Sequence, residues 1–216
     1  MPTPLSLQTT ALDHLRVIRT LMERSSIYRA VSAPAALVGG LLSLGVAIYG
    51  ISQNLLSKRF GNHEFCFAWL GVLVITTIIN LFLLMREAGS KGQPFITDGL
   101  RMALRAIVPP MLTGGVLGGC MIWLSRDIAL GAIVWVLCYG LALQATVSFA
   151  PRSIIVLARA FLITGQVLAI VFFLQNQHGM SKWKEDEASF TLGLTFGLFH
   201  IIYGIAVYFS KPKSNE

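Results

Sequence analysis

The sequence predicts an all-α, polytopic membrane protein, with six transmembrane helices in three hairpins preceded by an amphipathic N-terminal helix. The 216 residues are 55% hydrophobic and only 12% charged, whereas soluble domains carry about 25% charged residues. The apolar residues form blocks of roughly 20, the length at which a helix crosses a hydrocarbon core. The six blocks are 32–52, 65–85, 106–124, 128–149, 153–174 and 191–209.

Lysine and arginine are unequally distributed between the two sides of this arrangement. With both termini on the inner side, eleven lie inside, five lie outside and Arg159 lies within a span, which accounts for all 17. The positive-inside rule therefore predicts that both termini are cytoplasmic. The net charge of +7 is a topology signal in such a chain, and no nucleic-acid partner is expected.

Residues 1–30 precede the six-helix region 31–210 and are expected to form a basic amphipathic helix. Leu12, Leu15 and Ile18 belong to one apolar stripe, while arginines lie beside it. Such a helix is expected to lie in the cytoplasmic interface, against the lipid bilayer. The alternative is a docking surface for a protein partner in the cytosol. Residues 211–216 form a short cytoplasmic tail, and no cleaved signal peptide is expected.

The last span carries a regular stripe of small residues with a histidine in it. Spacings of four, three and four place the stripe within about 60° of a helix that turns 100° per residue. Thr195 falls on the opposite side, which is expected to face lipid. Because small residues permit close helix contact in a membrane, we expect the first and last spans to pack together and close the bundle. The two stripes are Gly193, Gly197, His200 and Gly204 in the last span, and Ala36, Gly40, Ser43 and Ala47 in the first.

Two further patterns concern packing. Gly114, Gly115, Gly118 and Gly119 form two overlapping small-xxx-small pairs in the third span, which predict close approach of another helix. A phosphate-binding loop is not expected, because no strand precedes these glycines and no Lys-Ser/Thr follows. The first and third spans also share an Arg, Pro and Gly-Gly spacing, which is either an internal repeat of the transporter kind or chance.

Polar residues inside spans are functional candidates by default. Asn80, Gln144 and Gln166 could share one polar cluster, and hydrogen bonding between helices is favoured over a polar pathway. Arg159 is expected to extend its guanidinium to the inner surface rather than bind a substrate. No acidic residue lies deep in a span, so a proton relay is not indicated.

His200 is expected to combine packing with one hydrogen bond, for instance to a serine of the first span. Haem ligation and pH sensing are less favoured, because no second histidine lies within a span. No catalytic, cofactor or metal site is expected. The three cysteines show no ligand spacing, and a metal held by loop acids with His63 and His178 is a weaker alternative.

Three stretches resemble a family of uncharacterised bacterial membrane proteins. They are Leu15-Arg-Val-Ile-Arg-Thr-Leu-Met-Glu-Arg-Ser-Ser26, Cys138-Tyr-Gly-Leu-Ala-Leu143 and Gly197-Leu-Phe-His-Ile-Ile-Tyr-Gly204. The resemblance implies a six-helix fold in the bacterial inner (cytoplasmic) membrane. It implies no known activity, and it supplies no catalytic residue.

The sequence thus favours a non-enzymatic accessory, scaffold or sensory protein. A transporter or channel for a small solute or ion is the alternative, because the spans are rich in glycine and contain Asn80, Gln144, Arg159, Gln166 and His200. A cavity at mid-depth lined by these side chains would favour transport, whereas a dry, fully packed bundle would count against it. An enzyme is the third possibility.

Overall fold

The computed structural model describes residues 33–53, 55–56, 61–90, 92, 95–96, 98–177 and 185–210. Within these residues the regular secondary structure is entirely helical. The predicted N-terminal helix 1–30 and the tail 211–216 lie outside the described part of the chain. The helices are the first helix Ala33–Gln53, α2 Asn62–Ser90, α3 Asp98–Trp123, α4 Ile128–Gln144, α5 Arg152–Gln177, α6 Glu185–Leu192, η1 Gly193–Phe199 and α7 His200–Phe209.

Five of these helical segments are long and apolar enough to cross a membrane, counting α6, η1 and α7 as one. α4 is apolar but shorter, with 17 residues. It ends at Gln144 and not at residue 149 as predicted, because the backbone tightens there. The amide of Thr146 bonds the carbonyl oxygen of Leu143 at 3.1 Å, and the Thr146 hydroxyl donates to the same oxygen at 2.7 Å.

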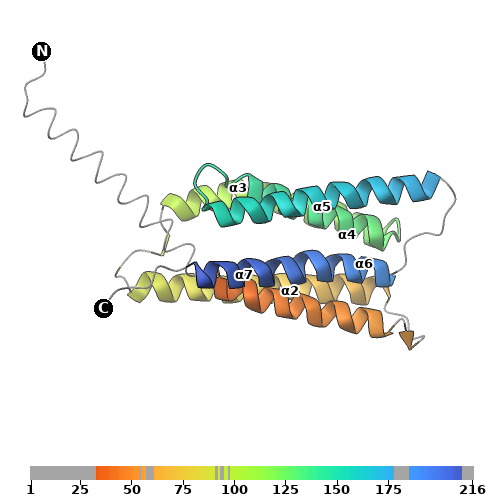
Figure 1. The fold of residues 1–216 in the computed structure, drawn as a ribbon, viewed down its shortest axis with the longest axis horizontal. Coiled ribbons are helices and arrows are strands. Elements are labelled where there is room, and N and C mark those ends of the chain that lie inside the picture. The colour runs from red at the N-terminus through yellow and green to blue at the C-terminus, as the bar shows by residue number, and fades with distance from the viewer. Residues whose placement is uncertain are drawn as a thin grey trace, which may run out of the picture.

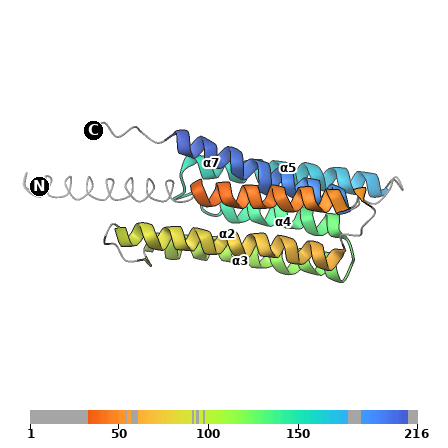
Figure 2. The ribbon, with the colours of Figure 1, turned by 90° about the horizontal axis from the view of Figure 1, so that it is seen from below.

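The helices lie roughly antiparallel in two layers (Figures 1 and 2). One layer holds α3, α4 and α5, with α4 in the middle. The other holds α2, the first helix and the α6–α7 segment, with the first helix in the middle. α4 packs closely against both α3 and α5, so its contacts are not confined to the α3–α4 hairpin that the sequence predicted.

Glycines bring the helices of the α3–α4–α5 layer together. A Cβ atom placed on Gly114 would lie 2.5 Å from Cβ of Cys138, and one on Gly140 would lie 3.0 Å from Cδ2 of Leu162. Gly118 meets the indole of Trp135. These approaches leave no room for a side chain, so Gly114 and Gly118 perform the packing that the sequence predicted for them. Gly115 and Gly119 do not, because a Cβ on either would meet nothing within 4 Å.

The first and last spans pack together, as predicted. A Cβ atom on Gly40 would lie 2.9 Å from the carbonyl oxygen of Gly197, and one on Gly193 would lie 2.6 Å from Cβ of Ala47. Gly204 meets Leu37 in the same way, at 2.6 Å from Cγ. Ala36 and Ser43 are buried as well. We call this contact the glycine seam.

Acidic side chains form local hydrogen bonds at the starts of two helices. The carboxylate of Glu64 accepts the Gly61 N–H at 2.7 Å at the start of α2, and Asp127 accepts the Leu130 N–H at 2.9 Å at the start of α4. Both satisfy amides that a helix N-terminus leaves free. Arg126 has φ of 53°, which lets the short α3–α4 connection reverse direction.

Candidate functional site

A cavity of about 140 Å³ lies between the two layers, on the side where α2 faces α3. Its lining comes from the first helix, α2, α3, α4 and the α6–α7 segment. It exists because the packing is close within each layer, at the glycines described above, and less close between layers. The cavity is partly open to the outside.

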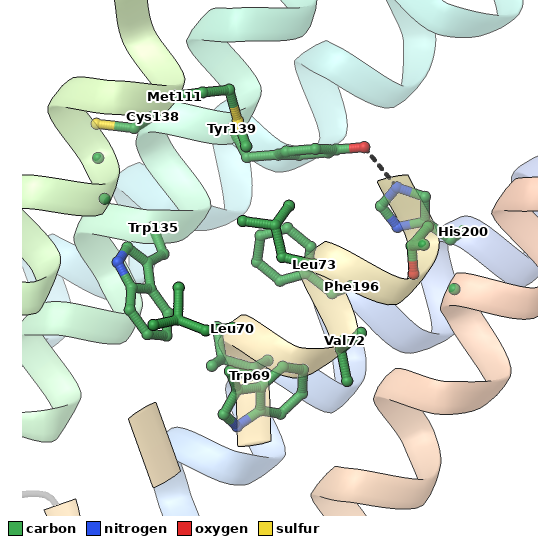
Figure 3. A pocket seen from close by; sticks show the side chains of 15 residues that line it. Trp69, Leu70, Val72, Leu73, Met111, Trp135, Cys138, Tyr139, Phe196 and His200 are labelled. Atoms are coloured by element: carbon green, nitrogen blue, oxygen red, sulfur yellow. Dashed lines mark hydrogen bonds between the residues drawn. The ribbon is translucent and has the colours of Figure 1, made fainter. Parts of the chain in front are cut away.

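Aromatic side chains form much of the wall. Trp69 of α2, Trp135 and Tyr139 of α4, and Phe196 of η1 surround the space that Figure 3 shows. Behind this wall, Phe65 stacks on Trp135 with ring centroids 6.4 Å apart. The rings expose carbon to the cavity, so almost all of its surface is apolar.

One end of the cavity holds a hydrogen bond between Tyr139 and His200. The Tyr139 hydroxyl lies 2.7 Å from Nε2 of His200 and joins the two layers (Figure 3). Phe196 stacks on the imidazole, at a centroid distance of 6.1 Å and an interplanar angle of 9°, and Phe161 meets it edge-on at 5.5 Å. The histidine is thus held by one polar partner and by aromatic rings. The expected hydrogen bond to a serine of the first span is wrong, since the partner comes from α4.

Four polar atoms of lining residues have no hydrogen-bond partner among the described residues. They are the indole nitrogens of Trp69 and Trp135, the hydroxyl of Thr76 and Nδ1 of His200. All four are shielded from the cavity surface as well as from solvent. Buried polar atoms normally find partners. Several polar atoms in these walls lack a partner, so the walls are shaped mainly by apolar contacts and not by hydrogen bonds.

The remaining polar candidates do not line the cavity. Arg159 and Gln166 lie exposed on α5. The extension of the Arg159 guanidinium to the inner membrane surface stays a prediction. Asn80 on α2 and Gln144 on α4 are half-buried. Because Gln166 faces outward, the structure does not gather Asn80, Gln144 and Gln166 into one cluster.

The last span departs from a regular helix in its middle. Gly193–Phe199 is a π-helix of seven residues, ending directly before His200. A π-helix has wider turns than an α-helix and often occurs at functional sites, so positions within it do not follow 100° per residue. Thr195 was expected to face lipid and is instead fully buried, with its hydroxyl donating to Thr191 at 2.8 Å.

Sequence reasoning missed Trp69, Trp135 and Tyr139 as site residues and treated them as ordinary core or interface aromatics. Trp69 and Trp135 are each seven residues from the first residue of their helix, or about 10 Å along it. Membrane tryptophans concentrate at the interfaces. Two tryptophans at the same depth within their helices, with Tyr139 one turn further along α4, were the sequence pattern that could have indicated the site.

Metal binding receives no support from the described part of the chain, where no group of three or more His, Cys, Asp or Glu side chains comes together. His63 stands against Trp123 with ring centroids 5.1 Å apart. His178 lies outside the described residues. Cys138 lines the cavity as a free thiol, and Cys66 is buried.

No protein-family model, curated protein or solved structure matches this chain. The resemblance drawn from three short stretches therefore stays a prediction, and the cavity carries the functional argument.

Proposed function

We propose that this protein is a non-enzymatic accessory or sensory protein of the bacterial inner membrane, which binds a small apolar ligand between its two helical layers. In this proposal six helices span the membrane, with both termini in the cytoplasm. The basic helix 1–30 would present the surface for a protein partner. The observation that carries the proposal is the partly open cavity with aromatic walls.

The chemistry of the walls selects the ligand. None of the residues that line the cavity is an acid, a lysine or an arginine, so nothing there would balance an ionic ligand, whose burial is costly without a partner. Trp69, Trp135 and Phe196 offer flat apolar surfaces. An apolar cavity of about 150 Å³ stays dry and accepts a molecule the size of benzene. The space of about 140 Å³ therefore suits one apolar ring or a short hydrocarbon.

Transport of a small solute is the second candidate. It is favoured by the position of His200, which lines a cavity between two layers of helices, because transporter sites lie at mid-depth between moving halves. It requires water to reach the cavity. The apolar walls, and the absence of Asn80, Gln144, Arg159 and Gln166 from them, weigh against an ion or a charged solute.

Filling the cavity tests the proposal. Leu73 lines the cavity and is 41% exposed, while Leu81 lies on the same helix, is 38% exposed and does not line it. In detergent, benzene should raise the thermal midpoint of the wild-type protein by a few degrees, because a ligand that binds only the folded state stabilises it. Leu73→Trp should remove this rise, because the added ring occupies the ligand's space.

The matched variant Leu81→Trp should keep the rise, because Leu81 does not line the cavity. A wild-type protein that shows no rise, or an equal loss in both variants, would contradict the proposed binding site. The midpoint without ligand provides the folding control for each variant.

A further inference from the structure

The boundary between α2 and α3 is fastened at one end. The Asn62 side chain donates to the carbonyl oxygen of Ile122 at 2.9 Å. The ring of Trp123 contacts His63 and Phe67, with centroids 5.1 Å and 5.8 Å apart. These contacts hold the first residues of α2 against the last residues of α3.

Further along the same boundary the helices leave an opening, which we call the mouth and define by Leu70, Leu73 and Gly115. All three line the cavity. Leu70 and Leu73 are 37% and 41% exposed, and a Cβ atom on Gly115 would meet nothing within 4 Å. The mouth therefore connects the cavity to the outer surface of the bundle.

The depth of the mouth decides what reaches it. Gly115 lies eight residues from the end of α3 at Trp123, and Leu73 lies eleven residues from the start of α2. At 1.5 Å per residue these are about 12 Å and 16 Å, well inside a hydrocarbon core of about 30 Å. Only 6% of the most apolar stretch of α2 is buried, so the surface beside the mouth is free to meet lipid.

We infer that the occupant of the cavity is the end of a lipid acyl chain, which enters sideways between α2 and α3 through the mouth at Gly115. This inference rests on the proposed function and names its ligand. Headgroups do not reach this depth, whereas acyl chains surround the mouth on the open side. The space holds about as many carbons as benzene, which is a segment of one chain.

The energetic reason is packing. A chain that moves from the bilayer into the bundle leaves one apolar medium for another, so it gains little from the hydrophobic effect. It gains from dispersion contacts with Trp69, Trp135 and Phe196, whose inner faces otherwise border a void. The cavity is occupied because the chain supplies contacts that the two layers do not make with each other.

Fluorescence quenching by brominated lipids tests this inference. Trp135 would be the single tryptophan, with Trp69, Trp123 and Trp183 replaced by phenylalanine, and the protein reconstituted in lipids brominated at mid-chain. Trp135 lines the cavity and belongs to α4, which lies in the middle of its layer (Figure 2), so a brominated chain in the cavity would lie against its ring. We expect strong quenching of the Trp135 fluorescence. In Gly115→Leu the quenching should fall at least twofold, because the added side chain, whose Cβ atom meets nothing within 4 Å, would block the mouth.

Gly119→Leu is the matched control. It lies one turn further along α3, also has nothing within 4 Å of a Cβ atom, and does not line the cavity. In this variant the Trp135 fluorescence should be quenched as strongly as in the parent single-tryptophan protein. Equal loss in both variants would overturn the inference and indicate a protein helix on this face of α3. Weak quenching in the parent would also overturn it, and the benzene experiment would then show whether an apolar ligand still binds.

Discussion

At the scale of single residues, the bond between Tyr139 and His200 is the polar contact that joins the two layers across the end of the cavity. It is short, at 2.7 Å, and is surrounded by the rings of Phe161 and Phe196. Bonds between transmembrane helices contribute about 0.6 kcal/mol on average and up to about 1.7 kcal/mol. In these apolar surroundings we expect this one to lie in the upper part of that range.

A double-mutant cycle measures this contribution. Tyr139→Phe keeps the ring and removes the hydroxyl, so it should lower the free energy of unfolding in mixed micelles by about 1–2 kcal/mol. In a protein that already carries His200→Leu, Tyr139→Phe should lower the free energy of unfolding much less, because the hydroxyl has already lost its partner. Strict additivity of the two changes would show that the bond does not couple the layers.

The sequence predicted that His200 makes one hydrogen bond and offered a serine of the first span as the partner, whereas the partner is Tyr139 of α4. The spacing of His200 with Gly193, Gly197 and Gly204 pointed to the first span, and those three glycines do contact that span. The partner Tyr139 lies 61 residues away in the chain. No local pattern identifies it, because the contact depends on how the two layers are placed.

At the scale of elements, the glycine seam shows what small residues achieve in a membrane. The backbones of the first helix and the last span approach until a Cβ on Gly40 would collide with a carbonyl oxygen of Gly197. Backbone cannot move aside as the end of a side chain can. The small-residue stripes were predictable from spacing alone, because the first helix and the last span each carry one in their own sequence.

Gly40→Ala tests the seam. The added methyl group should cost about 1–3 kcal/mol of unfolding free energy, as overpacking does elsewhere. Gly45→Ala in the same helix is the control, because a Cβ there meets nothing within 4 Å. It should leave stability unchanged within about 1 kcal/mol, the range of the helix propensity difference. Equal effects of the two variants, measured by denaturant titration in micelles, would contradict the close contact.

The π-helix Gly193–Phe199 marks the limit of prediction at this scale. Periodicity at 100° per residue placed Thr195 on the lipid face, whereas it is fully buried. The wider turn depends on packing against the neighbouring helices, which the sequence of one span does not contain. The boundary of α4 at Gln144 has a local cause, the turn at Thr146.

At the scale of the whole molecule, composition and block length predicted an all-helical chain with membrane-spanning helices, because these are properties of each segment alone. The cavity was not predictable in this way. Its lining comes from five parts of the chain, and it follows from close packing within layers and looser packing between them. The polar residues that the sequence singled out lie elsewhere, apart from His200.

The central claim is that the cavity is an apolar space filled from the bilayer and not a water-filled path. Thiol labelling at Met111, which lines it, tests this most directly. Met111→Cys would be made with Cys66, Cys120 and Cys138 replaced by alanine, and Ser125→Cys in the exposed α3–α4 turn would serve as the reactive control. In proteoliposomes, a charged and membrane-impermeant thiosulfonate should label Cys introduced at Ser125 and leave Cys introduced at Met111 unlabelled. Labelling at Met111 from either side of the membrane would contradict the claim and favour transport.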